Sequence, residues 1–412
     1  MPGPGMELIG AEEKKELLEV LESGYLFRYG SPDDPAFKAK VYQLEQEVAK
    51  LAGVPYAVAL NSGTSALLVA LCGLGVGPGD EVIVPGYTFI ASMSSIIWAR
   101  AVPILAEVDK SLTLDPIDVR KRITPRTKAI MAVHMLGNPS RLAELKAIAD
   151  EHRIFLIEDC AQAFGAKYKG CLVGSIGDVG TYSFNIFKTI TSGDGGMVVT
   201  KDEALYRRFF GIHDQGHSPL RTGVEVGQRP FVGLDFRLTE IQAAVLLAQL
   251  RKLDKISSHL HANKSRFKTA LKAAFPNLEF RDITDPVGEC ATLLTVFLPT
   301  EQIARSMAKE LGTKVVADSG WHVYSNMEQL LGKRTVTTEG CPFACPLYKG
   351  PEPKYWKGML PQTDALLARA VNISIGVSDG GLGSGFGVTM RDGFDVVDSK
   401  AADFIRVGKK YL

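Results

Sequence analysis

The sequence predicts an α/β fold, with a parallel sheet covered by helices on both faces and a smaller C-terminal α+β domain. Short apolar strands alternate with amphipathic helices along the first part of the chain, which is typical of such a sheet. After about Leu260 the strands and helices become fewer and more widely separated. We therefore expect a large domain over residues 1–258 and a small domain over residues 259–412.

Composition limits the possible classes of protein. The 412 residues include 47 Lys and Arg against 46 Asp and Glu, and 46% are hydrophobic, so a well-packed globular protein is expected. Its near-zero net charge favours neither a nucleic-acid partner nor a membrane partner. The six cysteines form no closely spaced Cys-x-x-Cys pairs, so we expect neither a disulfide scaffold nor a metal site. The first residues do not resemble a secretory signal, and we expect a cytoplasmic protein.

The elements of the large domain follow from apolar periodicity and turn residues. Two helices come first, at 12–21 and 37–52, with an aromatic-rich loop between them. The predicted strands are 56–60, 81–84, 103–106, 129–133, 155–158, 181–184 and 196–200. The predicted helices that follow are 65–74, 89–100, 116–122, 141–152, 202–210 and 239–257.

In the small domain the sequence predicts strands at 291–298 and 371–377, with helices at 300–311 and 400–409. The glycine-rich run 380–387 does not place glycines as a dinucleotide loop requires, because Phe386 stands at the sixth position counted from Gly381. We interpret it as a flexible loop.

Ligand sites in parallel sheets lie at the carboxyl ends of the strands. The turn Asn61 to Ser65 follows the first strand and opens a helix. Free amides there, with the hydroxyls of Ser62 and Thr64, suit a single phosphate. An ordinary capped helix start fits the same residues equally well.

Two further motifs follow apolar strands. Asp159 ends one strand, with Gln162 three residues on, and a carboxylate there can meet a cationic ring nitrogen; a helix cap or a metal ligand is the alternative. Lys188 lies in a stretch rich in hydroxyls and glycines between Ser183 and Gly196. These surroundings suit a desolvated amine for Schiff-base chemistry, whereas a surface lysine before a turn is the alternative.

Together, a phosphate cradle, an Asp and a Lys 29 residues beyond it (188 minus 159) are the parts needed to hold pyridoxal phosphate. Over roughly residues 10 to 260 the chain resembles the DegT/DnrJ/EryC1/StrS family of sugar aminotransferases. The matching motifs are residues 61–67, 84–89, 158–163, 193–196 and 233–244, with Lys188 after Tyr182-Ser183-Phe184.

The resemblance implies a fold type I enzyme with a mostly parallel seven-stranded sheet and pyridoxal 5′-phosphate as cofactor. Lys188 would bind the cofactor and carry the proton, and Asp159 would keep the ring nitrogen protonated. The other cofactor contacts that it implies are Ser62, Gly63, Thr64, Phe89 (stacked on the ring), Gln162 (near the ring hydroxyl), Ser183 and Asn185.

The family also implies a homodimer in which the second subunit completes each active site. Two departures matter. Asp235 stands where many members have an Asn that reaches the partner's phosphate, and a carboxylate there repels phosphate unless a cation such as Arg237 compensates. Asp194 stands where many relatives have Glu, one methylene longer.

The implied reaction moves an amino group from an amino acid such as glutamate to a sugar carbonyl, through pyridoxamine phosphate. Residues 123–130, 176–180 and 248–254 further resemble the subgroup that makes 8-amino-3,8-dideoxy-octulosonate. Candidate substrate contacts are Arg28, Tyr29, His213, His217, Trp321 and His322, each of which also suits a structural role. We expect a structural hydrogen bond for His134. The alternatives are an elimination or substitution enzyme with this cofactor, and a cofactor-binding sensor without turnover.

Overall fold

The computed structural model describes residues 3–31, 33–219 and 229–412. Its centre is a seven-stranded sheet in the order β1-β9-β8-β5-β4-β2-β3. Among these strands only β9 runs antiparallel to its neighbours. The strands are β1 Tyr56–Leu60, β2 Glu81–Pro85, β3 Val102–Ala106, β4 Thr127–Val133, β5 Phe155–Asp159, β8 Val179–Ser183 and β9 Gly196–Thr200. The predicted mostly parallel sheet is confirmed.

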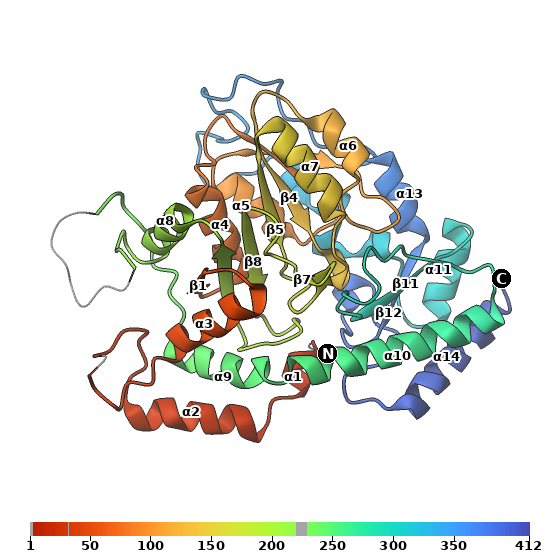
Figure 1. Ribbon diagram of the computed structural model, residues 1–412. Helices are drawn as coiled ribbons and strands as arrows, with labels where there is room; N and C mark the ends of the chain where they lie inside the picture. Colours follow the sequence, from red (N-terminus) through yellow and green to blue (C-terminus); the bar gives the residue numbers. More distant parts are fainter. Residues whose placement is uncertain (1–2, 32, 220–228) are drawn as a thin grey trace.

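Helices cover both faces of this sheet, as Figure 1 shows. Side chains of β1 alternate between them: Ala57 and Ala59 join the apolar cluster that contains α3, α6, α7 and α9, whereas Val58 and Leu60 join the cluster of α4, α5 and α8. The bounds are α3 Lys40–Ala52, α4 Gly63–Gly73, α5 Ile90–Trp98, α6 Pro116–Arg122, α7 Leu142–His152, α8 Glu203–His213 and α9 Glu240–Leu250. Because both faces of the sheet carry buried apolar side chains, the polar groups of the site lie at the strand ends.

Short elements complete the large unit. Before α3 lie α1 Pro4–Glu7 and α2 Ala11–Ser23, and α2 packs against α9. A short helix η1, Met135–Gly137, follows β4, and a small hairpin pairs β6 Lys167–Tyr168 with β7 Cys171–Leu172.

The C-terminal part has a three-stranded antiparallel sheet, β10-β11-β12. Its strands are β10 Glu279–Phe280, β11 Leu293–Phe297 and β12 Ala370–Ser374. Its helices are α11 Glu301–Glu310, α12 Glu328–Leu331, α13 Pro361–Arg369 and α14 Phe394–Gly408, with short helices η2 Val316–Asp318, η3 Gly320–His322, η4 Tyr324–Asn326 and η5 Gly380–Leu382. Neither β10 nor α13 was predicted, and α14 begins six residues before the predicted start at Lys400.

The predicted helix 239–257 is wrong. The chain instead forms α9, which ends at Leu250, and the longer α10, Leu253–Ala274. A continuous apolar period does not reveal the turn, which is held by tertiary contacts: the Lys252 ammonium donates to the Leu8 carbonyl at 2.8 Å and to the Glu13 carboxylate at 2.7 Å. Helix α10 continues past residue 258 and packs against α14, so the expected domain boundary falls inside a helix (Figure 1).

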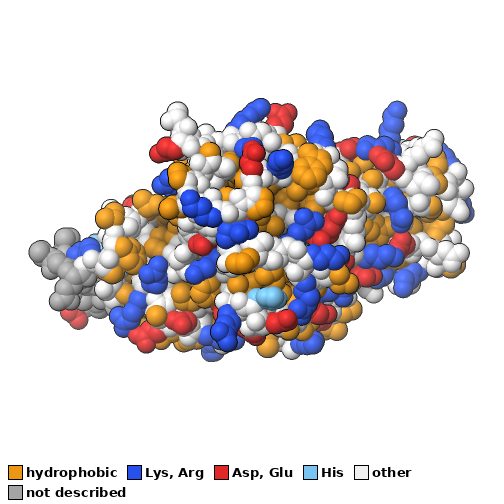
Figure 2. Space-filling model, turned by 90° about the horizontal axis from the view of Figure 1, so that it is seen from above, with side chains coloured by type: hydrophobic (Ala, Val, Ile, Leu, Met, Phe, Trp, Pro, Cys, Tyr) orange, Lys and Arg blue, Asp and Glu red, His pale blue; other side chains and the backbone are white. Residues whose placement is uncertain are grey.

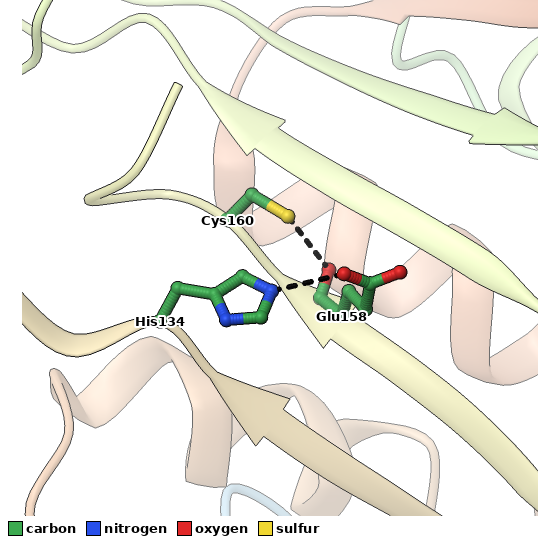
Figure 3. A group of neighbouring side chains, drawn as sticks. All are labelled: His134, Glu158 and Cys160. Atoms are coloured by element: carbon green, nitrogen blue, oxygen red, sulfur yellow. Dashed lines mark hydrogen bonds and ion pairs between the residues drawn. The ribbon is translucent and has the colours of Figure 1, made fainter. Parts of the chain in front are cut away.

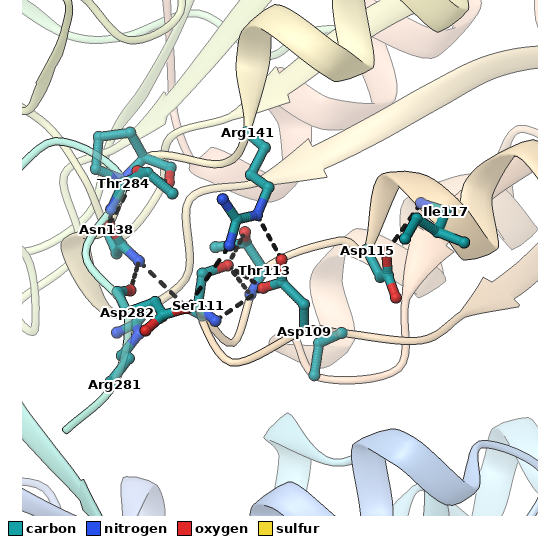
Figure 4. A network of polar contacts seen from close by, with 12 residues as sticks. Asp109, Ser111, Thr113, Asp115, Ile117, Asn138, Arg141, Arg281, Asp282 and Thr284 are labelled. Carbon is teal, nitrogen blue, oxygen red and sulfur yellow. Dashed lines mark hydrogen bonds and ion pairs between the residues drawn. The ribbon is translucent and has the colours of Figure 1, made fainter. Parts of the chain in front are cut away.

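Polar contacts join the C-terminal part to loops that follow β3 and β4 (Figure 4). The buried Arg281 guanidinium donates to the Ser111 carbonyl at 2.7 Å and to the Met135 carbonyl at 2.5 Å. The Asn138 amide donates to the Asp282 carbonyl at 2.9 Å. Because these contacts use backbone carbonyls, they fix the loop at the end of β4, which borders the site described below.

Charges of both signs are intermixed on the face shown in Figure 2, as the near-zero net charge leads one to expect. Among the described residues, the search for a bilayer-spanning helix finds none with the necessary length and apolarity.

Candidate active site

A cavity of about 580 Å³ opens at the carboxyl ends of β1, β5 and β8, and the C-terminal part closes one side of it. Parallel strands bring their carboxyl ends to one edge, so residues distant in sequence meet there. The cavity is lined by most of the residues that the sequence predicted: Ser62, Gly63, Thr64, Phe89, Asp159, Gln162, Ser183, Asn185, Lys188, Trp321 and His322.

The turn after β1 has the form of an anion cradle. Ser62 caps α4: its Oγ accepts from the Ser65 amide at 3.0 Å and lies 2.8 Å from the Ser65 hydroxyl, which itself donates to Asn61. The Ser62 hydroxyl is therefore committed to the cap, and the amides at the helix start remain to face the cavity. A Cβ at Gly63 would lie 2.6 Å from the Ser183 Cβ, so only glycine allows this close approach.

Asp159 ends β5 and is almost fully buried. The Ser92 hydroxyl of α5 donates to its Oδ2 at 2.7 Å, and the Ala161 amide donates to its Oδ1 at 3.1 Å. Ser92 in turn lies 2.7 Å from the Thr88 hydroxyl. Donors on both oxygens fix the carboxylate at the inner end of the cavity, where it can accept from a ring N–H.

Lys188 lies in the loop between β8 and β9 and is half-buried at the cavity wall. Burial lowers the pKa of its amine, against the charges of Asp159 and Asp379, which raise it. Within the described residues the amine makes no hydrogen bond or ion pair. An amine with a lowered pKa and no competing partner suits a nucleophile or a proton carrier.

The remaining predicted contacts surround these groups. Phe89 caps α5 and presents a partly exposed ring, whose centroid lies 5.2 Å from that of His322 and 6.5 Å from that of Trp321. The Gln162 side chain accepts from the Leu136 amide at 3.0 Å. The Asn185 amide donates to Asp194 at 3.0 Å, so the shorter carboxylate still reaches a partner across the loop.

Asp235 does not line the cavity. Arg237 binds its carboxylate at 2.5 Å and also binds the buried Asp214 at 2.5 Å. The cation named as a condition for tolerating Asp235 is therefore present beside it. The segment runs next to the cradle, since the Asn61 amide donates to the Phe236 carbonyl at 2.9 Å.

The structure divides the six predicted substrate contacts into two sets. Trp321 and His322 line the cavity, whereas Arg28, Tyr29, His213 and His217 do not. Arg28 forms a buried ion pair with Glu45 at 3.0 Å, and His213 bridges the Arg28 guanidinium and the Phe210 carbonyl. Tyr29 bonds Asp214, and His217 bonds Arg229. The positions of these residues in the sequence cannot tell which of them line the cavity, because both sets follow strands or helices near the same edge of the sheet.

Sequence reasoning missed several lining residues. Ser92 contacts Asp159, while Lys314 and Asp379 reach the cavity from the C-terminal part. Asp379 caps η5 by accepting from the Gly381 amide at 2.7 Å, so the glycine-rich run forms part of the cavity wall. No recognisable motif surrounds Lys314, and only the packing of the C-terminal part brings it here.

His134, Glu158 and Cys160 lie close together beneath the site (Figure 3). His134 Nδ1 accepts from the Ser140 amide at 2.9 Å, so Nε2 carries the proton that it donates to Glu158 at 3.0 Å. Burial raises the pKa of Glu158, but His134 and the amides of Gly177 and Gly174 outweigh it and lower the pKa. With both ring nitrogens occupied, His134 has the structural hydrogen bonds that were expected and offers no lone pair to a metal.

These residues fit pyridoxal phosphate. The glycine-made cradle at Gly63 and Ser183 suits the phosphate, the buried carboxylate of Asp159 suits a protonated ring nitrogen, and Lys188 provides an unpaired amine. Each is a chemical match between this chain's donors or acceptors and one part of the cofactor.

Comparison with known proteins agrees with this fit. The chain is 42% identical over 257 residues to GDP-perosamine synthase of Caulobacter vibrioides, covering 62% of this chain and 65% of that protein. It is 38% identical over 281 residues to L-glutamine:2-deoxy-scyllo-inosose aminotransferase of Streptoalloteichus tenebrarius, covering 65% and 66%. The matches thus span just under two thirds of these relatives.

Among solved structures, an aminotransferase from Psychrobacter cryohalolentis has a TM-score of 0.78 at 26% identity and covers 100% of this chain and 99% of its own. The predicted fold type I architecture is thereby confirmed. A model of the DegT/DnrJ/EryC1/StrS aminotransferase family matches residues 7–349. The chain therefore belongs to the DegT/DnrJ/EryC1/StrS aminotransferase family, whose cofactor is pyridoxal 5′-phosphate.

Proposed function

We propose that this chain is a pyridoxal-phosphate aminotransferase that transfers an amino group from an amino acid to a carbonyl carbon of a sugar or cyclitol. The observation that supports it most strongly is the half-buried Lys188 amine, free of ion pairs among the described residues, at the wall of a cavity that also holds Asp159. One relative is named L-glutamine:2-deoxy-scyllo-inosose aminotransferase, and that name supports the same reaction class.

The cofactor, when bound, supplies a carbonyl that takes up the amino group and a ring that accepts an electron pair from the substrate carbon. The chain's own groups do the rest. Lys188 Nζ takes a proton from the substrate carbon and returns it, as a positioned base with a lowered pKa can do. The Asp159 carboxylate, held in place by Ser92, would accept from the ring N–H of the bound cofactor. The apolar walls around Phe89 and Leu136 limit the entry of water.

For the substrates, we propose glutamate or glutamine as donor and a sugar as acceptor, with C8 of a 3-deoxy-octulosonate as the specific candidate. One relative is named for L-glutamine as its donor. Trp321, 65% exposed at the cavity, offers a face on which a sugar ring can pack. The octulosonate rests on the sequence resemblance alone.

We also propose a homodimer whose second subunit completes the site. Around Asp235 and Arg237 the described surface exposes Leu26, Phe27, Val232 and Leu234, and Val232 is 97% exposed. Apolar side chains gathered around an ionic pair are typical of an interface. Light scattering tests the dimer. Mixing Lys188→Ala with Arg237→Ala protein then restores partial activity only if one subunit's 235–237 segment serves the other's site.

The alternatives keep the cofactor and change the chemistry. An elimination enzyme would release a keto product, and a substitution enzyme a product with one group exchanged, in each case without leaving the amino group on the cofactor. A sensor would bind the cofactor without turnover. Retention of the Lys188 amine, Asp159 and the Phe89 ring in one cavity favours turnover.

The deciding experiment is a spectroscopic donor and acceptor screen. Wild-type protein loaded with cofactor should show a visible absorbance band, and borohydride should lock the label onto Lys188. Glutamate or glutamine should bleach the band, and a keto sugar should restore it. Bleaching by no amino acid contradicts the proposal, and so does a borohydride label on Lys188→Ala protein.

A further inference from the structure

Two cations line the described part of the cavity, Lys188 and Lys314. Lys188 faces the charges of Asp159 and Asp379. Lys314 comes from the C-terminal part, is half-buried, and makes no hydrogen bond or ion pair through its ammonium within the described residues. A half-buried ammonium without a carboxylate partner gains the most from an anion that enters beside it.

Backbone contacts hold Lys314 in place. Its neighbour Thr313 donates through its hydroxyl to the Gly383 carbonyl at 2.8 Å and accepts from the Gly385 amide at 3.2 Å. On the other side Val315 forms a β-bridge with Val371. The Lys314 backbone is thus anchored before substrate arrives, which lowers the cost of ordering its side chain.

His322 provides the second, independent observation. It lines the same cavity and is 8% exposed, yet its buried Nδ1 has no hydrogen-bond partner among the residues that the structure describes. Burial, helped by the nearby charges of Lys188 and Lys314, lowers the pKa of His322 to about 3. The ring is therefore neutral at physiological pH and keeps one N–H donor and one acceptor. Its backbone is fixed because the His322 carbonyl accepts from the Thr88 amide at 2.9 Å.

We propose that Lys314 and His322 form a subsite for an anionic oxygen group of the substrate, a carboxylate or a phosphate. Lys314 supplies the charge, and the neutral His322 ring supplies a hydrogen bond beside it. Asp379 also lines the cavity, and its Oδ1 accepts from the Gly381 amide; because a carboxylate accepts from hydroxyls and repels an anion, it is not part of the proposed subsite. The inference rests on the proposed function, and it adds that the substrate carries an anionic group directed toward the C-terminal wall.

Three sources of such a group can be separated by calorimetric titration of cofactor-loaded protein. The probes are 2-oxoglutarate for the donor side, 3-deoxy-octulosonate for a sugar acid, and UDP for a nucleotide-linked sugar, with myo-inositol as the uncharged reference. Lys314→Ala should weaken one anionic probe about 10- to 100-fold, the range of a charge-assisted hydrogen bond, and leave myo-inositol unchanged. Lys314→Arg should retain most of the binding.

Matched variants separate charge from shape. Lys309→Ala removes an exposed charge from α11 of the same unit and should bind every probe as wild type does. His322→Asn, which keeps a polar group near Nδ1, should bind more tightly than His322→Phe. Equal binding of all three anions by Lys314→Ala and wild type overturns the inference, as does a wild type that binds none of them. A wild type whose absorbance no amino donor changes contradicts the proposed function instead, because titration with anions does not require amino transfer.

Discussion

Two lysines, Lys188 half-buried and Lys264 buried, show how desolvation of an amine serves different ends in two regions of the molecule. Burial lowers the pKa of Lys188 at the cavity wall and of Lys264 inside α10. The cost of burying the Lys264 ammonium is offset by an ion pair to Glu289 at 2.5 Å, and both side chains are buried. Lys188 has no such partner among the described residues. A buried cation that is paired supports the fold, whereas one left unpaired is available for chemistry.

The largest expected effect separates the two lysines by activity. Lys188→Ala should lower the rate of amino transfer by about 10²- to 10⁴-fold or more, because the proton carrier is lost. Its free energy of unfolding should stay within about 1 kcal/mol of wild type, since no partner is left unpaired. Stopped-flow absorbance and urea denaturation of the apoprotein measure the two quantities. A large loss of stability would place Lys188 with Lys264 and break the comparison.

The second prediction exchanges the roles. Lys264→Met should lower the free energy of unfolding by about 3–5 kcal/mol, because Glu289 is left buried without its cation. The double variant Lys264→Met, Glu289→Leu should recover most of this loss. The borohydride label on Lys188 should be unchanged in whatever fraction remains folded. If the single and double variants are equally stable, the loss of stability does not come from leaving Glu289 buried and unpaired.

The third prediction extends the comparison to two histidines. His213 has both ring nitrogens bonded, whereas the buried Nδ1 of His322 has no partner in the described part of the chain; the pKa of each is lowered to about 3, mainly by burial. Each histidine is neutral in the folded protein and protonates near pH 6.5 in the unfolded chain. The contribution of each to the free energy of unfolding is therefore full above pH 6.5 and is lost as the pH falls toward 3, because the unfolded chain then binds the extra proton. His213→Gln should reduce that slope by about 1.4 kcal/mol per pH unit. Urea denaturation at pH 4 to 7 checks it, and an unchanged slope would contradict a neutral interior His213.

The smallest expected effect concerns the support of the site. Ser92→Ala removes one donor from Asp159 and should weaken cofactor affinity by about 0.5–1.5 kcal/mol, or roughly 2- to 10-fold. Ser94→Ala is the control on the same helix, since its hydroxyl donates to the Ala91 carbonyl and not to Asp159. Absorbance titration of the apoprotein measures both. If the two variants bind the cofactor equally, Ser92 does not position Asp159.

Much of the large unit could be predicted from sequence because its signals are local. The helix Pro116–Arg122 and the strand Tyr56–Leu60 have the predicted bounds, set by a proline start and by a continuous apolar run. The break between α9 and α10 could not be predicted, because it is stabilised by hydrogen bonds from Lys252 to Leu8 and Glu13, which lie near the N-terminus. The elements of the C-terminal part were predicted least well, since a two-residue strand such as β10 has almost no local pattern.

The same division holds for the site. The sequence by itself predicted Asp159 at a strand end, the cradle around Gly63 after a strand, and Lys188 in the loop that follows Ser183. All three line one cavity because parallel strands end at one edge. Only the tertiary structure decided that Ser92 holds Asp159, that Lys314 and Asp379 complete the wall, and that Arg28 and His213 lie outside it. The physical reason is range: strand periodicity and helix capping act over a few residues, whereas burial and pairing depend on groups that only the packed chain brings together.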